Sequence, residues 1–310
     1  MRSVPLGPTD TLVPNVIAGM MRIREKSDDE IRALYRAARD AGATLFDHAD
    51  IYGGQMHACE DRFGSALDLS ASERAEITLQ TKTGIVPAEG SYDFSYEHIA
   101  SSVEGSLRAL RTDYVDVLLL HRPDALVEPE EVARAFDALE QSGKVRAFGV
   151  SNHTPRQIDL LRTAVRQPIV ANQLQLSLSH STIVTQGLAA NTRTDDGVVR
   201  DGGGVLDFCR LHGITVQAWS PFQKRDGSGV FLGAQDHPEL NAELDRLAAR
   251  YDVTPIAIAT AWITRHPAGM QVVLGTTTPE RVTAASAGSD IPLTRAEWYG
   301  LVRAAGNAVP

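Results

Sequence analysis

The chain has 310 residues, of which 43% are hydrophobic and 22% are charged. This is the composition of an ordinary globular protein rather than a disordered or fibrous one. The formal net charge of −9 at pH 7, without a basic stripe, argues against binding to nucleic acid or to an anionic membrane. The two cysteines, Cys59 and Cys209, stand far apart, so neither a metal site nor a disulfide framework is expected. No stretch has the apolar length of a signal peptide or a membrane span, which favours a cytoplasmic protein.

Short β-branched runs alternate with longer helical patterns along the chain, which indicates repeated strand–helix units and a parallel sheet. Eight such units in a chain of this length favour a closed (β/α)₈ TIM barrel, with residues 1–310 as one α/β domain. A G-x-G-x-x-G fingerprint is absent after the first strand, which argues against a Rossmann domain. The predicted strands are Val16–Met20, Thr44–Ala49, Ile77–Thr83, Tyr114–His121, Val145–Val150, Ile169–Leu176, Ile214–Trp219 and Val272–Gly275.

Helices are predicted between these strands where apolar residues recur with a spacing near 3.6, as in Asp28–Ala41 and Ser95–Leu110. Two segments are too long for ordinary barrel connections. We expect His180–Gly204 and Gln223–His237 to form long loops after the sixth and seventh strands. The expected N-caps are Asp28, Thr154 and Thr254, and the glycines at which helices should end are Gly42, Gly143 and Gly213.

Active sites of such barrels lie at the C-terminal ends of the strands, and four titratable side chains occupy those ends here. The second strand ends in LFDHADIYGG, which carries Asp47 and Tyr52. The third ends in LQTKTG with Lys82, and the fourth in LLLHRP with His121. A carboxylate, a phenol, an ammonium and an imidazole are therefore predicted to meet at one mouth.

These motifs resemble those of the aldo-keto reductases, and the resemblance covers nearly the whole chain. The segment FDHADIYG has the family's spacing between its Asp and Tyr, and Lys82 and His121 follow at similar intervals. Within the family, the sequence is most similar to a group of bacterial oxidoreductases. Four further segments match the family's cofactor-binding segments in order: GVSNH, NQLQL, AWSP and GTTTPER.

The resemblance implies an enzyme that transfers a hydride from NADPH to an aldehyde or ketone, and the residues suit that chemistry. The carbonyl oxygen must receive a proton, and a free tyrosine has a pKa of about 10. A neighbouring ammonium lowers that pKa. We assign Tyr52 as general acid, Lys82 as the group that tunes it and Asp47 as the carboxylate that orients Lys82. His121 would hydrogen-bond the substrate carbonyl and position it.

The resemblance also implies how NADP is held, with no metal ion. Ser151, Asn152 and Gln173 would bind the nicotinamide carboxamide, and Trp219 would stack on the ring. The arginine of GTTTPER, at the start of the helix after strand eight, offers a planar fork to the 2′-phosphate. The remaining residues expected to contact the cofactor are Gly19, Met20, Asp47, Ser220, Pro221, Phe222, Gly275, Thr276, Thr277, Thr278 and Arg281.

Three departures from the family pattern affect this expectation. The loop after strand seven reads FQKRDGSG, which is bulkier than usual. Ala284 and Ala285 stand where the family often has polar residues for adenine, and Gly275 where it often has a lysine. The preference for NADP over NAD could therefore be modest.

Two other functions are compatible with parts of this pattern. A barrel lyase could use Lys82 as a Schiff-base nucleophile, although Tyr52, Trp219 and GTTTPER would then have no task. A sensing subunit could bind the cofactor with little turnover, although the four-residue set is intact. The substrate's identity and the oligomeric state are left open by the sequence.

Overall fold

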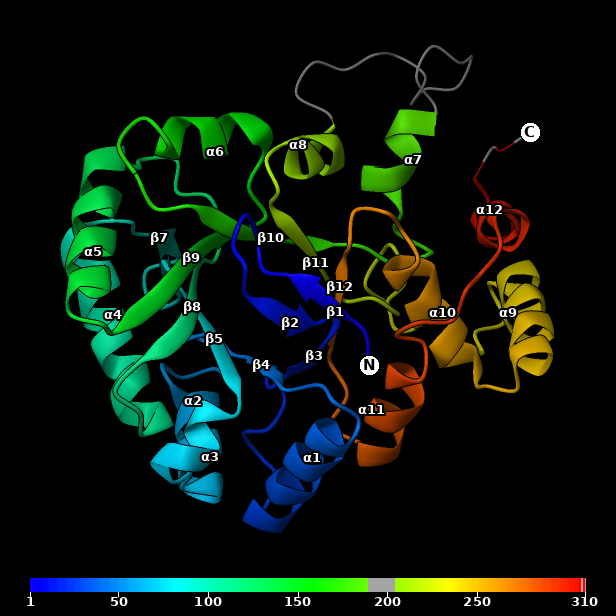
Figure 1. Ribbon diagram of the computed structural model, residues 1–310, viewed down its shortest axis with the longest axis horizontal. Helices are drawn as coiled ribbons and strands as arrows, with labels where there is room; N and C mark the ends of the chain where they lie inside the picture. The colour runs from blue at the N-terminus through cyan, green and yellow to red at the C-terminus, as the bar shows by residue number, and fades with distance from the viewer. Residues whose placement is uncertain (189–203, 308, 310) are drawn as a thin grey trace.

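Eight parallel strands close into a barrel, in the order β10-β11-β12-β3-β4-β5-β8-β9 (Figure 1). The computed structural model describes residues 1–188, 204–307 and 309. The expected strands and the (β/α)₈ class are confirmed, with strand ends shifted by a few residues at most. The barrel strands are β3 (Val16–Gly19), β4 (Leu45–Asp47), β5 (Thr78–Thr83), β8 (Val115–Leu120), β9 (Val145–Ser151), β10 (Ile169–Gln175), β11 (Thr215–Trp219) and β12 (Gln271–Leu274).

Helices surround the barrel and pack either against the outside of the sheet or against neighbouring helices (Figure 1). This contact contains most of the buried apolar side chains, so the main core lies between the strands and the helices. The described helices are α1 (Asp28–Asp40), α2 (Ala58–Leu67), α3 (Ala71–Ala75), α4 (Tyr96–Leu110), α5 (Pro129–Gln141), α6 (Pro155–Leu161), α7 (Thr182–Leu188), α8 (Val205–Leu211), α9 (Pro238–Tyr251), α10 (Pro255–Thr264), α11 (Pro279–Ser286) and α12 (Arg295–Ala304). In the described part of the chain, no helix has the length and apolar character needed to cross a membrane.

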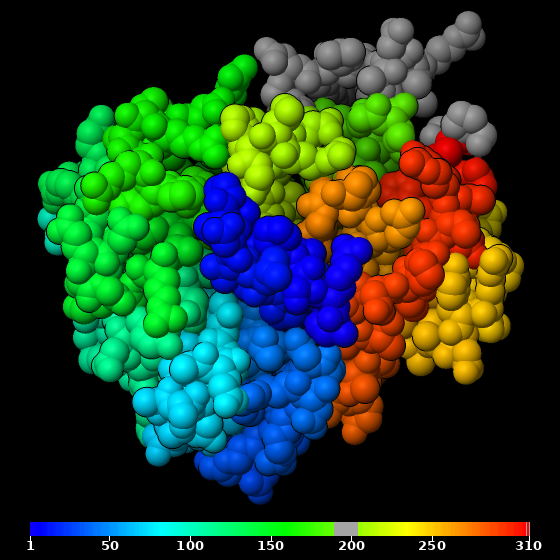
Figure 2. Space-filling model, in the orientation of Figure 1, coloured from blue at the N-terminus to red at the C-terminus, as the bar shows by residue number. Residues whose placement is uncertain are grey.

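An N-terminal hairpin, β1 (Ser3–Pro5) with β2 (Leu12–Pro14), covers the end of the barrel where the strands begin. In Figure 2 these first residues, in blue, lie across the centre of that face. Val4 pairs with Val13, and both side chains join a second core inside the barrel. Because this end is closed, the open end lies at the C-terminal ends of the strands. The hairpin was not predicted, since three-residue strands rich in proline give no periodic signal.

The predicted helix boundaries are correct except at one cap. Asp28 was expected to cap α1, but Ser27 does so, because its side chain accepts a hydrogen bond from the Glu30 amide while Glu30 bonds back. Thr154 caps α6 as expected. Thr254 occupies the N-cap of α10 without a side-chain hydrogen bond.

The two long connections differ from the expected simple loops. The first contains α7, whose apolar Val184 is buried, and 189–203 of it lie outside the described residues. The second folds back on itself, with Gln223 bridged to Val230, and ends where α9 begins. A further short hairpin, β6 (Ile85–Val86) with β7 (Ser91–Tyr92), rises from the open end after β5.

Close packing of α2 against α4 makes Gly64 a sensitive position. A Cβ added there would stand 2.2 Å from the carbonyl oxygen of Ala109, which belongs to the α4 backbone and has little room to move. We expect Gly64→Ala to lower the free energy of unfolding in urea by about 1–3 kcal/mol. Gly187→Ala in α7 is the matched control, since no atom of the described residues lies within 4 Å of its added Cβ. Equal stability of the two variants would contradict this account of the α2–α4 contact.

Candidate active site

The ammonium group of Lys82 is the centre of the polar cluster at the open end of the barrel. It is fully buried and donates to both carboxylate oxygens of Asp47, at 2.8 and 2.7 Å. It also donates to the His48 carbonyl at 2.8 Å and to the Tyr52 hydroxyl at 3.0 Å. β4 supplies Asp47, β5 supplies Lys82, and the turn after β4 supplies Tyr52, so three predicted residues meet in one contact.

Burial and the nearest opposite charge shift the pKa values of Lys82 and Tyr52 in opposite directions. Burial alone would lower the pKa of Lys82, but Asp47 and Tyr52 raise it above its ordinary value, so the group stays an ammonium. Burial raises the pKa of Tyr52, and the Lys82 charge offsets only part of that rise. The net direction for Tyr52 is opposite to the lowering expected from the sequence, because burial outweighs the neighbouring charge. A tyrosine in this state holds its proton at neutral pH.

His121 completes the predicted set from the end of β8. Its ring stands edge-on to the Tyr52 ring, with centroids 5.9 Å apart, and its amide donates to the Thr83 carbonyl at 2.9 Å. Burial, followed by the charge of Lys82, lowers the pKa of His121 well below its ordinary value. The ring is therefore neutral, and one nitrogen can donate a hydrogen bond into the cavity.

A layer of four buried glutamines supports Asp47 from inside the barrel. Gln80 and Gln173 both donate to Asp47 Oδ1, at 2.6 and 3.1 Å. Gln80 and Gln217 exchange two hydrogen bonds, and Gln217 donates to Gln271 at 3.0 Å. The glutamine amides thus fix the position of the Asp47 carboxylate, and this carboxylate in turn fixes the Lys82 ammonium. This layer was not predicted, although a glutamine at an inward position of each of β5, β10, β11 and β12 was a visible signal.

A cavity of about 1310 Å³ opens above this cluster and contains most of the predicted site. Lys82 lies below it, covered by Tyr52 and Asp47. Met20 is 1% exposed and does not line the cavity; Met21 and Arg22, which were not predicted, do. The predicted residues that line it are Gly19, Asp47, Tyr52, His121, Ser151, Asn152, Gln173, Trp219, Ser220, Pro221, Phe222, Gly275, Thr276, Thr277, Thr278 and Arg281.

The residues expected to bind a carboxamide form a rigid group on one wall. Trp219 Nε1 donates to Asn152 Oδ1 at 3.0 Å, and the Asn152 amide donates to Ser151 Oγ at 2.9 Å. Asn152 and Ser220 both have positive φ, 62° and 52°, a strained backbone that is common at binding sites. The Oε1 atom of Gln173 accepts no hydrogen bond from a described residue, so it remains available to a ligand amide.

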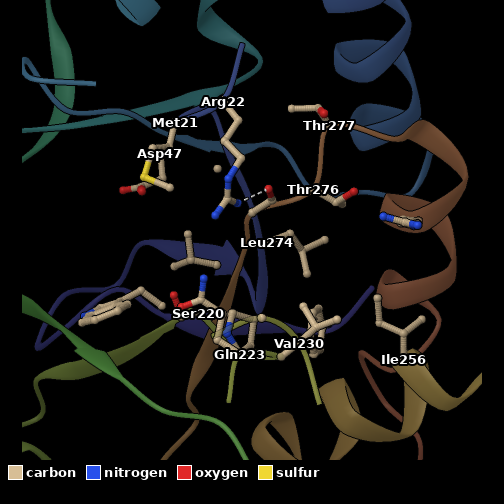
Figure 3. A pocket seen from close by; sticks show the side chains of 18 of the residues that line it. Met21, Arg22, Asp47, Ser220, Gln223, Val230, Ile256, Leu274, Thr276 and Thr277 are labelled. Atoms are coloured by element: carbon tan, nitrogen blue, oxygen red, sulfur yellow. Dashed lines mark hydrogen bonds between the residues drawn. The ribbon is translucent and has the colours of Figure 1, made fainter. Parts of the chain in front are cut away.

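The opposite part of the cavity offers groups suited to phosphate. Thr276, Thr277 and Arg281 line it where β12 leads into α11. In Figure 3, Arg22 reaches from the end of β3 toward the same turn, and its guanidinium donates to the Gly275 carbonyl at 2.7 Å. Val230 and Ile256 form an apolar boundary in the same view. Threonine hydroxyls, two arginines and an apolar wall fit the charged and aromatic parts of a dinucleotide, although the Thr276 hydroxyl oxygen already accepts a hydrogen bond from the Thr278 amide.

A second buried carboxylate lies beside the cluster and takes no part in it. Asp50, two residues before Tyr52, is fully buried. Its Oδ2 atom accepts a hydrogen bond from Ser102 in α4 at 2.7 Å, whereas Oδ1 has no partner among the described residues. Burial raises the pKa of Asp50 to about 6, and the nearby Glu60 adds to this effect. Glu60 itself bonds to His57 at 2.6 Å.

Comparison with known proteins decides the family. The model of the aldo/keto reductase family matches residues 15–304. The chain belongs to the aldo/keto reductases. The expected likeness to bacterial oxidoreductases is confirmed by YdhF of Escherichia coli, which is 35% identical over 87% of this chain and 86% of the relative. A protein named 6-dehydroglucose reductase from Agrobacterium fabrum is 36% identical over 92% of each chain.

Solved structures agree on the fold of this aldo/keto reductase. An aldo-keto reductase from Klebsiella pneumoniae, crystallised with NADPH, superposes with a TM-score of 0.76 at 24% identity. The superposition covers 97% of this chain and 94% of the other. At that identity the likeness concerns the barrel, and the site residues of this reductase rest on their own geometry. Among the described residues no group of histidines, cysteines and carboxylates could hold a metal ion.

The raised pKa of Asp50 predicts a pH-dependent stability. Because the pKa is higher in the folded protein than in the unfolded chain, protonation favours folding, and this contribution is lost as the pH rises through about 6. Between pH 5 and pH 7.5 the loss is about 1–2 kcal/mol. Urea unfolding at both pH values should show that Asp50→Asn loses less stability than the natural protein over this interval. Identical losses would show that Asp50 does not titrate in this range.

Proposed function

We propose that this aldo/keto reductase uses NADPH to reduce an aldehyde or ketone, with Tyr52 as the general acid. The observation that carries the proposal is the 3.0 Å hydrogen bond from the buried Lys82 ammonium to a tyrosine hydroxyl that lines the cavity. A phenol in that position can give its proton to a carbonyl oxygen while the ammonium stabilises the phenolate left behind. Asp47 fixes the direction of the ammonium through two short hydrogen bonds.

The substrate carbonyl would lie between Tyr52 and His121, whose rings are nearly perpendicular. Neutral His121 donates a hydrogen bond to the carbonyl oxygen and holds it within reach of the Tyr52 hydroxyl. The low pKa of His121 supports this role, because an imidazolium would compete with Tyr52 as the acid. His121 therefore positions the substrate and Tyr52 moves the proton.

The bound cofactor would supply the hydride, and two groups of residues would hold it. Ser151, Asn152 and Gln173 fit the carboxamide, with Trp219 against the ring. The turn from β12 into α11, with Thr276 to Thr278 and Arg281, fits the adenosine 2′-phosphate, and the choice of NADPH is supported by the similarly folded Klebsiella reductase, which was crystallised with it. Met20 is not part of this proposal, since it is buried and does not line the cavity.

The geometry disfavours the two alternatives considered from the sequence, a Schiff-base lyase and a cofactor-binding sensing subunit. A Schiff-base lyase needs a neutral, accessible amine, whereas Lys82 is fully buried, protonated and hydrogen-bonded to four acceptor atoms. A sensing subunit would have no need for the tyrosine to line the cavity beside His121. Because one relative is named for 6-dehydroglucose, that compound belongs in a panel of simple and sugar-derived aldehydes and ketones.

Removal of the Tyr52 hydroxyl tests the proposed acid. We expect Tyr52→Phe to lower kcat at least about a hundredfold, because the variant lacks the proposed proton donor, with the Kd for NADPH nearly unchanged. Steady-state loss of nicotinamide absorbance gives kcat, and fluorescence titration gives the Kd. Tyr299→Phe in α12, whose ring packs on Trp298 far from the cluster, is the control. Turnover retained by Tyr52→Phe would refute the assignment.

Comparison of NADPH binding with NADH binding tests whether Arg281 recognises the 2′-phosphate. A charge-assisted hydrogen bond contributes on the order of 1.5–3 kcal/mol, so Arg281→Ala should weaken NADPH binding by about tenfold or more. NADH lacks the 2′-phosphate and should bind this variant and the natural protein almost equally. Titration of both variants with both cofactors measures the four dissociation constants. Equal losses for NADPH and NADH would mean that Arg281 does not recognise the 2′-phosphate.

A further inference from the structure

Three arginines line the cavity, and none of them pairs with a carboxylate among the described residues. They are Arg22, Arg122 and Arg281. Elsewhere on the described surface arginines commonly have such partners, as Arg62 has in Asp28 at 2.7 Å. An acidic chain with unpaired guanidinium groups around one cavity has the charge pattern expected for anionic ligands.

Two of these arginines face the part of the cavity assigned to the dinucleotide phosphates. Arg22 bonds to the Gly275 carbonyl beyond β12, and Arg281 belongs to α11, which follows β12. Arg122 is placed differently, because it follows His121 at the end of β8. In the closed order of eight strands, β8 is four positions from β12, on the opposite side of the barrel. The proposed cofactor therefore leaves the charge of Arg122 unexplained.

Arg122 has no ion-pair partner among the described residues. The carboxylate nearest to it in the chain, Asp124, is already engaged, since its Oδ1 accepts from the Leu126 amide at 2.8 Å and its Oδ2 from the Phe94 amide at 3.0 Å. Arg122 is exposed and makes no side-chain hydrogen bond or ion pair with a described residue, yet it lines the cavity. Its charge also reaches the reacting groups, as it contributes to the low pKa of His121.

The surroundings of Arg122 offer a substrate few other polar contacts. Ile51 and Ile85 line this side of the cavity with apolar side chains. Asn152 uses its amide oxygen for Trp219 and its amide nitrogen for Ser151 and the His121 carbonyl. A substrate held by Tyr52 and His121 would thus extend along an apolar wall on which Arg122 is a cation without a carboxylate partner among the described residues.

We propose that Arg122 binds a carboxylate on the substrate, so that the carbonyl compounds reduced by this protein are oxo acids. This inference rests on the proposed function and adds the substrate class to it. A guanidinium binds a carboxylate through two parallel hydrogen bonds, which fixes both the charge and the orientation of the molecule. The carbonyl group would then lie at Tyr52 and the acid group at the rim.

The test compares ω-oxo acids of increasing chain length with their methyl esters, which keep the same aldehyde and lose the charge. For the natural protein with NADPH, at least one acid should have a kcat/KM about tenfold or more above that of its ester. Arg122→Gln should bring this ratio close to one. Arg122→Lys should keep an intermediate ratio, because an ammonium retains the charge but not the fork. Arg108→Gln, on the exposed side of α4 near its C-terminal end, is the control for loss of one positive charge and should leave the ratio unchanged.

A ratio near one for every pair in the natural protein, with both compounds reduced, would overturn the role of Arg122 and leave the proposed reduction intact. If neither compound is reduced, the proposed function fails for this class of substrate. The role of Arg122 is then tested by ligand binding instead of turnover. Calorimetry with NADP⁺ present would then compare ω-hydroxy acids with their methyl esters. Tighter binding of the acids that is lost in Arg122→Gln supports the inference, and equal binding of both refutes it.

Discussion

A single ammonium buried inside the barrel determines how the rest of the site is arranged. Removing a charge from water costs several kcal/mol unless partners compensate for it. Lys82 meets this requirement with Asp47, a backbone carbonyl and the Tyr52 hydroxyl, all within 3.0 Å. The tyrosine is one of the ligands that make the buried charge tolerable, so stability and chemistry depend on the same contact. The turn that carries Tyr52 therefore has little freedom to move its hydroxyl elsewhere.

A second feature of the site is the distribution of charge, because the cavity wall is positive although the whole chain is acidic. The chain carries a net charge of −9, yet the cavity walls hold three arginines without carboxylate partners among the described residues. Of the acidic groups close to the mouth, Asp47 is paired with Lys82 and Asp124 accepts hydrogen bonds from backbone amides, whereas Asp245 lines the cavity without an ion-pair partner among the described residues. Local positive potential can thus coexist with overall negative charge, because screening in water limits each field to about 10 Å.

The sequence was sufficient to predict the barrel and most of the cavity, because both depend on local patterns. Each strand is a short apolar run bounded by turns, and the proposed site residues lie at strand ends or in the segments that directly follow them, so their convergence follows largely from topology. What could not be predicted depends on contacts between distant segments. The N-terminal hairpin is stabilised by the inner core rather than by its own propensity. The Tyr52 pKa depends on the balance of burial and charge, and the displacement of Met20 by Met21 depends on a one-residue shift at a strand end.

The amide layer beneath Asp47 constrains how this protein can change over evolutionary time. Gln80 and Gln217 satisfy each other reciprocally, and Gln173 and Gln271 each bond to Gln217 as well. Replacing one glutamine by an apolar residue would leave buried donors and acceptors without partners, at a cost of about 1–3 kcal/mol for each group. An apolar interior would require several of these positions to change together. In an alignment of this protein's orthologues, the four positions should therefore covary, with glutamine kept at all of them or lost from most of them.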